Sequence, residues 1–140
     1  MGLRHDGRVI AVQTLYRYEI ARPPPAELTD YSWIEPQQRR QLPRGTLQFA
    51  SLLVAGCIEN LAAVDRMIDR HLEHWNLDRL ARVDLSVLRL GVYCLLWQPD
   101  IPAEVTIDES VAVAKQFGSD DSYRFVNGVL DSVRKTVAQR

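Results

Sequence analysis

"LDRLARVDLSVLRLGVYCLLW", residues 77–97, is the stretch that decides the fold. After Asp84 it is apolar on almost every side, which leaves no polar face for a surface helix; the apolar positions are Leu85, Val87, Leu88, Leu90, Val92, Tyr93, Leu95 and Leu96. A helix that is apolar all round is buried by its neighbours. "QPDIP" ends the stretch because proline cannot continue a helix. The sequence therefore predicts a central helix with other helices packed around it.

Two charged residues interrupt this helix. Arg89 sits among apolar residues, and a buried arginine needs a carboxylate or several carbonyl groups. We therefore expect Arg89 to tie helices together inside the fold. Asp84 lies one turn earlier, and two interpretations stay open: it caps the helix, or it is an acid that awaits a partner.

The segments on both sides of the central helix also have helical periodicity. We expect helices over residues 8–20, 46–75 (two helices broken near Asn60), 103–117 and 121–137, and no strand. Five of the seven prolines fall in residues 23–43, so residues 21–44 form a long connection with one short helix near 25–34. The result is an all-α domain, residues 1–140, of about six or seven helices in two helical subdomains, roughly 1–75 and 76–140.

Composition and charge exclude several classes of protein. A hydrophobic share of 46% and a charged share of 25% are typical of a globular domain. The absence of an 18-residue apolar run and of a secretory signal predicts a cytoplasmic protein without membrane contact. Cys57 and Cys94 lie in apolar helical contexts, which indicates two buried thiols. The histidines and cysteines lack zinc-type spacing, so we expect no metal and no cofactor.

Catalysis is not expected. The sequence holds no nucleophile elbow, phosphate-binding loop or dinucleotide fingerprint. Asp108 and Glu109 are adjacent carboxylates, but neighbours on a helix do not face each other. We interpret one as a surface charge and the other as a partner for an arginine such as Arg89.

A binding module is the remaining class. Arg4, His5 and Arg8 precede Gln13, Tyr16 and Arg17 on the first helix. Arginine suits phosphate, and an aromatic ring with a nearby glutamine suits unpaired bases. The alternative is a frayed basic N-terminus beside a half-buried tyrosine. The net charge of −1 gives no long-range attraction for nucleic acid.

"SDDSYRFVNGVLD", residues 119–131, contains Asn127-Gly128, a strong hairpin signal. The stripe of Phe125, Val126, Val129 and Leu130 nevertheless indicates a helix. A glycine inside a helix costs about 1 kcal/mol relative to alanine. We therefore expect another backbone to pack against Gly128, and Asn127 to be buried or half-buried.

Three segments resemble the NusB family. They are "RVIAVQTLY" (8–16), "LARVDLSVLRLGVYCLL" (80–96) and "IPAEVTIDESVAVAKQFGSDDSYRFVNGVLD" (101–131), so that only residues 21–44 lack the resemblance. The resemblance implies an all-helical fold of two subdomains and binding to single-stranded boxA RNA. It also implies a heterodimer with NusE, a small-subunit ribosomal protein, which acts with RNA polymerase and the other Nus factors. The implied role is to suppress premature termination, chiefly in ribosomal RNA operons.

Carried over to this chain, the resemblance implies specific site residues. The RNA-binding residues would be Arg4, His5, Arg8, Gln13, Tyr16, Asp121, Ser122 and Phe125, and Asp84 would face NusE. His5 and Asp6 stand where the family usually has more basic residues, and Cys94 stands where many members have glutamate. Three other possibilities stay open: a helical scaffold whose partner carries the RNA contact, a hydrolase or transferase acting through Asp108 and Glu109, and a domain separated from a methyltransferase. Whether the chain forms a homodimer is also open.

Overall fold

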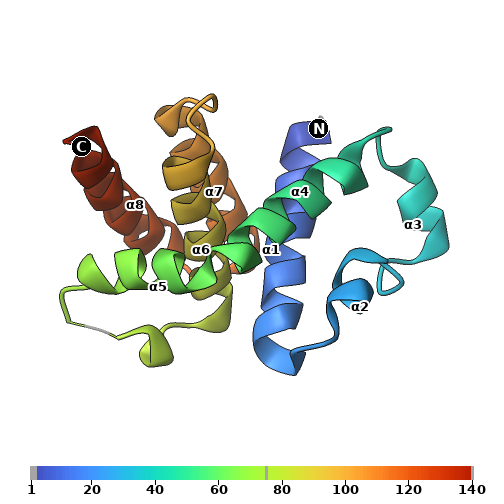
Figure 1. Ribbon diagram of the computed structural model, residues 1–140, viewed down its shortest axis with the longest axis horizontal. Helices are drawn as coiled ribbons and strands as arrows, with labels where there is room; N and C mark the ends of the chain where they lie inside the picture. The colour runs from blue at the N-terminus through green and yellow to red at the C-terminus, as the bar shows by residue number, and fades with distance from the viewer. Residues whose placement is uncertain (1–2, 75, 140) are drawn as a thin grey trace.

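The structure, a computed structural model, describes residues 3–74 and 76–139 and is all helical in that part of the chain (Figure 1). The elements are α1 (Leu3–Ala21), α2 (Pro25–Thr29), α3 (Pro36–Gln41), α4 (Thr46–Glu59), α5 (Leu61–Arg70), the 3-10 turn η1 (Leu77–Arg79), α6 (Arg82–Trp97), α7 (Ala103–Phe117) and α8 (Ser122–Ala138). The predicted all-α class is confirmed.

The helix boundaries follow local chemistry. The predicted break near Asn60 is confirmed: α4 and α5 meet there at 74°, and the Asn60 side-chain amide donates to the carbonyl of Gly56 at 2.8 Å. The proline-rich connection holds two short helices, α2 and α3, where we expected one. Each begins with a proline in its first turn, where the missing N–H group has no cost. This difference raises the count to eight α-helices in the described residues.

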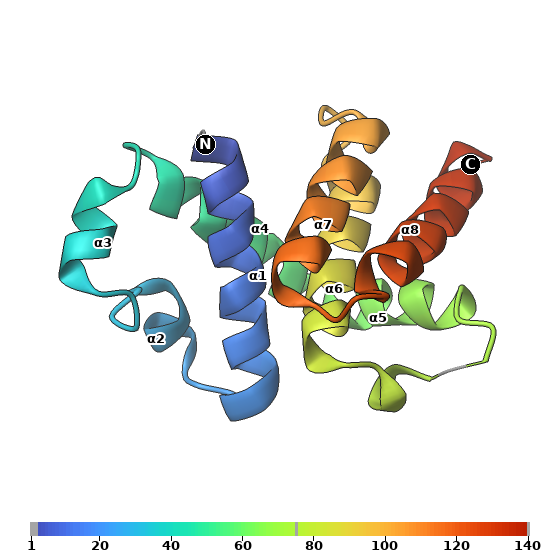
Figure 2. The same ribbon diagram turned by 180° about the vertical axis from the view of Figure 1, so that it is seen from behind.

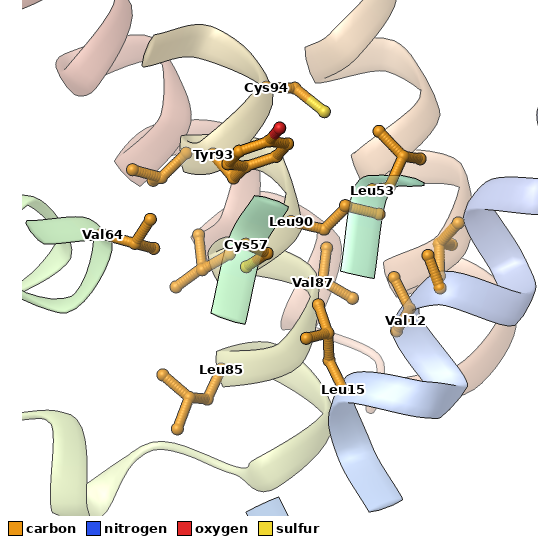
Figure 3. Close-up of a cluster of buried hydrophobic side chains, with 14 of the residues drawn as sticks. Val12, Leu15, Leu53, Cys57, Val64, Leu85, Val87, Leu90, Tyr93 and Cys94 are labelled. Atoms are coloured by element: carbon orange, nitrogen blue, oxygen red, sulfur yellow. The ribbon is translucent and has the colours of Figure 1, made fainter. Parts of the chain in front are cut away.

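α6 is the centre of the fold, as its sequence predicts. Every residue from Leu85 to Cys94 is buried. Side chains from α1 and α4, such as Leu15 and Leu53, lie close to Val87 and Leu90 of α6 (Figure 3). In both views α1 to α4 lie on one side and α5 to α8 on the other. Because α5 lies with the second group, we propose a subdomain boundary near Asn60 rather than near residue 75.

Arg89 ties three helices together, which confirms the predicted buried tie. Its Nε and Nη2 atoms donate to the two carboxylate oxygens of Asp65 on α5, both at 2.9 Å. Its Nη1 atom donates to Glu19 on α1 at 3.0 Å. The expectation that Asp108 or Glu109 would pair with Arg89 was wrong, because both lie on α7: Asp108 is exposed and Glu109 pairs with His5.

The expectation about Asn127 and Gly128 was also wrong. Both residues are exposed, and a Cβ atom added to Gly128 would meet nothing within 4 Å. The glycine that allows close packing between α6 and α8 is Gly91, where an added Cβ would lie 2.9 Å from Leu130 Cδ1. The α6–α8 contact thus depends on a glycine in α6, and the exposed face of α8 carries the Asn-Gly pair.

No single helix in the described residues is long and apolar enough to cross a membrane, although the bent pair α4–α5 passes the same test of length and composition when taken together.

Candidate nucleic-acid interface

Four of the expected site residues meet in one pocket. The start of α6 and the turn before α8 enclose about 220 Å³, lined by Arg79, Leu80, Ala81, Asp84, Ser119, Asp121, Ser122 and Phe125. The first turn of α6 and residues 119–125 are far apart in sequence but adjacent here. The expected partner-binding residue Asp84 therefore shares a surface with three of the expected RNA-binding residues.

The polar residues of this pocket have different environments. Ser122 is buried, and its Oγ atom accepts a hydrogen bond from the backbone N–H of Ser119 at 3.0 Å. This bond closes the turn before α8, so Ser122 has a structural role, and its expected RNA contact stays a prediction. Asp121 is exposed and makes no capping hydrogen bond, so its carboxylate faces solvent.

Asp84 is the orphaned acceptor of the pocket. Ala81 occupies the cap position of α6, and no side chain caps that helix. The Oδ1 atom of Asp84 is enclosed and has no hydrogen-bond partner among the described residues. Leaving a buried acceptor unpaired costs about 1–3 kcal/mol. Of the two interpretations left open by the sequence, the structure favours an acid that awaits a partner over a helix cap.

Gln13 and Tyr16 line a second pocket of about 290 Å³ next to the first one. Its other lining residues are Val12, Arg17, Trp33, Val83 and Phe117. Val83 precedes Asp84 on α6, so the two pockets adjoin at the first turn of that helix. Tyr16 is 40% exposed, which leaves much of its ring open for contact.

Sequence reasoning named Arg17 with Gln13 and Tyr16 but missed two aromatic residues of the second pocket, Trp33 and Phe117. Arg17 packs over the ring of Trp33, with its Cζ atom 5.4 Å from the ring centroid. Trp33 lies in the irregular connection, where no periodicity indicates which residues turn toward α1. Phe117 ends α7 directly before Gly118 and is 38% exposed. In the sequence, the only signal that could have identified it was its position as an aromatic residue at the predicted end of a helix.

The basic residues at the start of α1 lie apart from these pockets. Arg4 is exposed, but Arg8 is only 6% exposed, and both guanidinium groups lie over the ring of Phe49 on α4. His5 Nδ1 lies 2.9 Å from Glu109 Oε2 on α7, so His5 links α1 to α7. The structure thus divides the eight expected RNA-binding residues into a basic end of α1 and two adjoining pockets. In Figure 2, α1, α7 and the turn before α8 all lie at the front of the molecule, toward the viewer.

Asp108 and Glu109 line none of the five pockets described for the molecule. Within residues 3–74 and 76–139 no three His, Cys, Asp or Glu side chains are grouped to hold a metal ion. Aromatic rings, arginines and a few polar side chains make up the surface.

Comparison with known proteins identifies the family. The family model described as "NusB family" matches residues 5–135. The chain belongs to the NusB family. The match covers every expected site residue except Arg4. The transcription antitermination protein NusB of Treponema pallidum (strain Nichols) is 44% identical over 135 residues, which span 95% of this chain and 93% of that protein.

Solved structures of NusB proteins have the same fold as this NusB-family chain. T. maritima NusB has a TM-score of 0.81 and 38% identity, over 94% of this chain and 90% of that one. A second match, with a TM-score of 0.84 and 26% identity, covers 96% of this chain and 97% of the other. That structure is described as the antitermination factors NusB and NusE in complex with double-stranded RNA.

Proposed function

We propose that this chain is a transcription antitermination factor that binds single-stranded boxA RNA together with NusE and has no catalytic activity. It would act with RNA polymerase and the other Nus factors to suppress premature termination, chiefly in ribosomal RNA operons. Membership of the NusB family supports the antitermination role. The structural neighbour that holds NusB and NusE with double-stranded RNA supports the binding of RNA together with NusE.

One observation carries the proposal. Residues from three distant segments, expected to bind RNA or NusE, line two adjoining pockets: Gln13 and Tyr16 in one, and Asp84, Asp121 and Phe125 in the other. Unpaired bases stack on aromatic side chains, and stacking contributes about 1–3 kcal/mol per base. Tyr16 and Phe125 supply one ring to each pocket. A single strand that crosses from α1 to α8 would meet both.

The same surface is also the contact that we propose for NusE. The unpaired Oδ1 atom of Asp84 needs a hydrogen-bond donor, and a partner that brings a basic or N–H group would supply it. The net charge of −1 gives RNA little long-range attraction to this chain alone. We therefore expect modest RNA binding by the chain alone and tighter binding once NusE is present.

Tyr16→Ala tests the proposal, because the side chain is exposed and its removal leaves the core intact. We expect the variant to bind boxA RNA about tenfold more weakly than wild type, since one stacked base is lost. The measurement is a fluorescence titration with boxA RNA and with a scrambled RNA, with and without NusE. Ile20→Ala is the matched control, because Ile20 is 58% exposed on the same helix and lines neither pocket. Equal binding of boxA and scrambled RNA by the NusE complex would refute the proposal.

A second candidate function is a helical scaffold whose partner carries the whole RNA contact. The net charge of −1 favours it, because RNA feels little long-range attraction to this chain and a basic partner could supply the phosphate contacts. Under this alternative, Tyr16→Ala would bind RNA as well as wild type in the presence of NusE, whereas Asp84→Ala would weaken NusE binding. The same titration therefore separates the two functions.

A further inference from the structure

We infer that Phe49 on α4 is a positioning residue: it holds Arg4 and Arg8, two of the expected RNA-binding residues, in one orientation, and we call these three residues the arginine clamp. This inference rests on the proposed function and deepens it, because it names the side chain that orients the expected contact with the RNA backbone. Phe49 belongs to α4 and is not one of the RNA-binding residues that the resemblance to the family implies.

The geometry places both guanidinium groups on one ring. The Cζ atoms of Arg4 and Arg8 lie 4.6 Å and 5.6 Å from the centroid of the Phe49 ring. The two arginines are one turn apart on α1, so their side chains leave the same face of the helix. A cation over an aromatic face is attracted to it, and the attraction increases as the site loses water. Phe49 therefore fixes two flexible side chains in one orientation.

Gly7 allows this arrangement. A Cβ atom added to Gly7 would lie 2.5 Å from Phe49 Cδ2, closer than any side chain permits. The glycine between the two arginines thus brings the ring against the backbone of α1. Any larger residue would push Phe49 away and separate it from the two guanidinium groups.

The clamp has no counter-charge of its own. No carboxylate lies within ion-pair distance of Arg4 or Arg8 among the described residues. Asp6 is two positions from each arginine, and residues two apart on a helix do not face each other. Cys94 is close enough for the charge of Arg8 to act on it, but burial raises the pKa of the Cys94 thiol to about 11, so the thiol stays neutral.

These observations indicate an anionic ligand. Two like charges one turn apart repel each other, and Arg8 is more than nine-tenths buried, so an unneutralised charge there is costly. An anion placed between the two groups removes both costs. The planar guanidinium fork matches the oxygen atoms of a phosphate. The ligand that the proposed function supplies is a phosphodiester group of the RNA strand.

Two substitutions of Phe49 test its positioning role. Phe49→Leu keeps an apolar side chain but removes the aromatic face, and we expect RNA affinity to fall about tenfold. The slope of log affinity against log salt should become shallower by about 0.7, because one ordered phosphate contact on a single strand is lost. Phe49→Tyr keeps the ring and should bind within about twofold of wild type.

Several outcomes would overturn the clamp. If Phe49 only packs, Phe49→Leu lowers the thermal midpoint but leaves RNA affinity and the salt slope at their wild-type values. An equal loss of affinity in the folded Leu and Tyr variants would equally contradict a role for the aromatic face. Circular dichroism confirms that each variant is folded before titration.

A second, independent test supplies the missing counter-charge from within. Cys94→Glu places a carboxylate at a position on which the charge of Arg8 acts, and Cys94→Gln places a neutral side chain of nearly the same shape there. We expect the Glu variant to bind RNA more weakly than the Gln variant, with a shallower salt slope. Equal affinity of the two folded variants would overturn the clamp, and if neither variant folds, the Phe49 pair decides the question.

The titrations distinguish a failure of the clamp from a failure of the proposed function. If wild type binds boxA in preference to scrambled RNA and Tyr16→Ala weakens that binding, the function stands whatever Phe49 does. If wild type with NusE shows no preference for boxA, the function fails.

Discussion

Gly128 and Gly91 both lie inside helices but differ in their surroundings: Gly128 is open to solvent, and Gly91 is closely packed. Gly128 is exposed, with no atom near an added Cβ, so its flexibility has a cost that no contact within this chain offsets. Gly128→Ala should raise the free energy of unfolding by about 1 kcal/mol, the difference in helix propensity between the two residues. Urea denaturation followed by circular dichroism measures it.

Gly91→Ala is the matched comparison. Its Cβ atom would lie 2.9 Å from Leu130 Cδ1 and 3.1 Å from Ser110 Oγ, so the core of α6, α7 and α8 would have to move apart. Overpacking of this kind costs about 1–3 kcal/mol. A destabilised Gly128→Ala variant would contradict the open environment seen at that position.

Asp121 is an exposed acid on the surface that we propose for RNA. Its exposed carboxylate lines the pocket that holds Phe125, so it repels a phosphate that passes nearby. Asp121→Asn removes the charge at nearly constant shape and should bind boxA RNA as tightly as wild type or more tightly. Filter binding at moderate salt measures the effect. A clear loss of affinity would mean instead that Asp121 accepts a hydrogen bond from a base.

The sequence identified residue types better than residue environments. The buried tie through Arg89 follows from a charge inside an apolar helix. The burial of Arg8 does not follow, because Phe49 lies far along the chain on α4 and local periodicity carries no information on that contact. Asn127 was misjudged for a related reason: an Asn-Gly pair indicates a backbone preference, but only packing decides which face of α8 is covered.

At the scale of elements, the ion-pair network around Arg89 joins α1, α5 and α6. Glu19 contacts Arg89, Arg82 and Arg22 at 3.0, 3.1 and 3.4 Å. Burial alone would raise the pKa of Glu19, but the hydrogen bond from Arg89 and the charges of the three arginines outweigh it and hold the pKa below its ordinary value of 4.5. α1 is thus held to the central helix by a carboxylate that must stay ionised.

This network makes stability depend on acid. Because the folded pKa of Glu19 is depressed, its contribution is complete above 4.5, the unfolded value, and is lost as the pH falls through the folded value. The thermal midpoint of the wild type should decrease as the pH is lowered below about 4.5. Glu19→Gln should be less stable than wild type at neutral pH, and its thermal midpoint should change less between neutral and acidic pH. Glu104→Gln, in an exposed pair with Arg134, should follow the wild-type curve. If Glu19→Gln loses thermal stability at acidic pH as steeply as wild type does, Glu19 is not the cause of the acid sensitivity.

Helices with a clear apolar stripe could be predicted closely, and those without one could not. α7 was expected over residues 103–117 and spans them, because Pro102 and Gly118 bound a periodic segment. α2 and α3 are five and six residues long, too short for a stripe to be recognised. α1 begins earlier than expected because its first turn carries the polar residues of the basic end.

For the molecule as a whole, the proposed RNA binding must work against a net charge of −1. Long-range attraction is absent, so the affinity would depend on a few local contacts: the arginine clamp, the two pockets and the surface proposed for NusE. The clamp and the pockets lie at different places along α1, which spans about 27 Å at 1.5 Å per residue for 18 steps. Several nucleotides of a single strand could therefore be contacted at once, each by a different chemistry.

This separation of contacts predicts how RNA binding depends on salt. If only the clamp contacts the backbone, one phosphate is neutralised, and the slope of log affinity against log salt for single-stranded RNA should be about −0.7 for the chain alone. Addition of NusE should increase the affinity and make the slope steeper if the partner brings cations of its own. Fluorescence titrations of boxA RNA at several salt concentrations, with and without NusE, give both slopes. A slope near zero for the chain alone would show that its contacts are only to bases, whereas a slope far steeper than about −0.7 would require further cationic side chains to contact the strand.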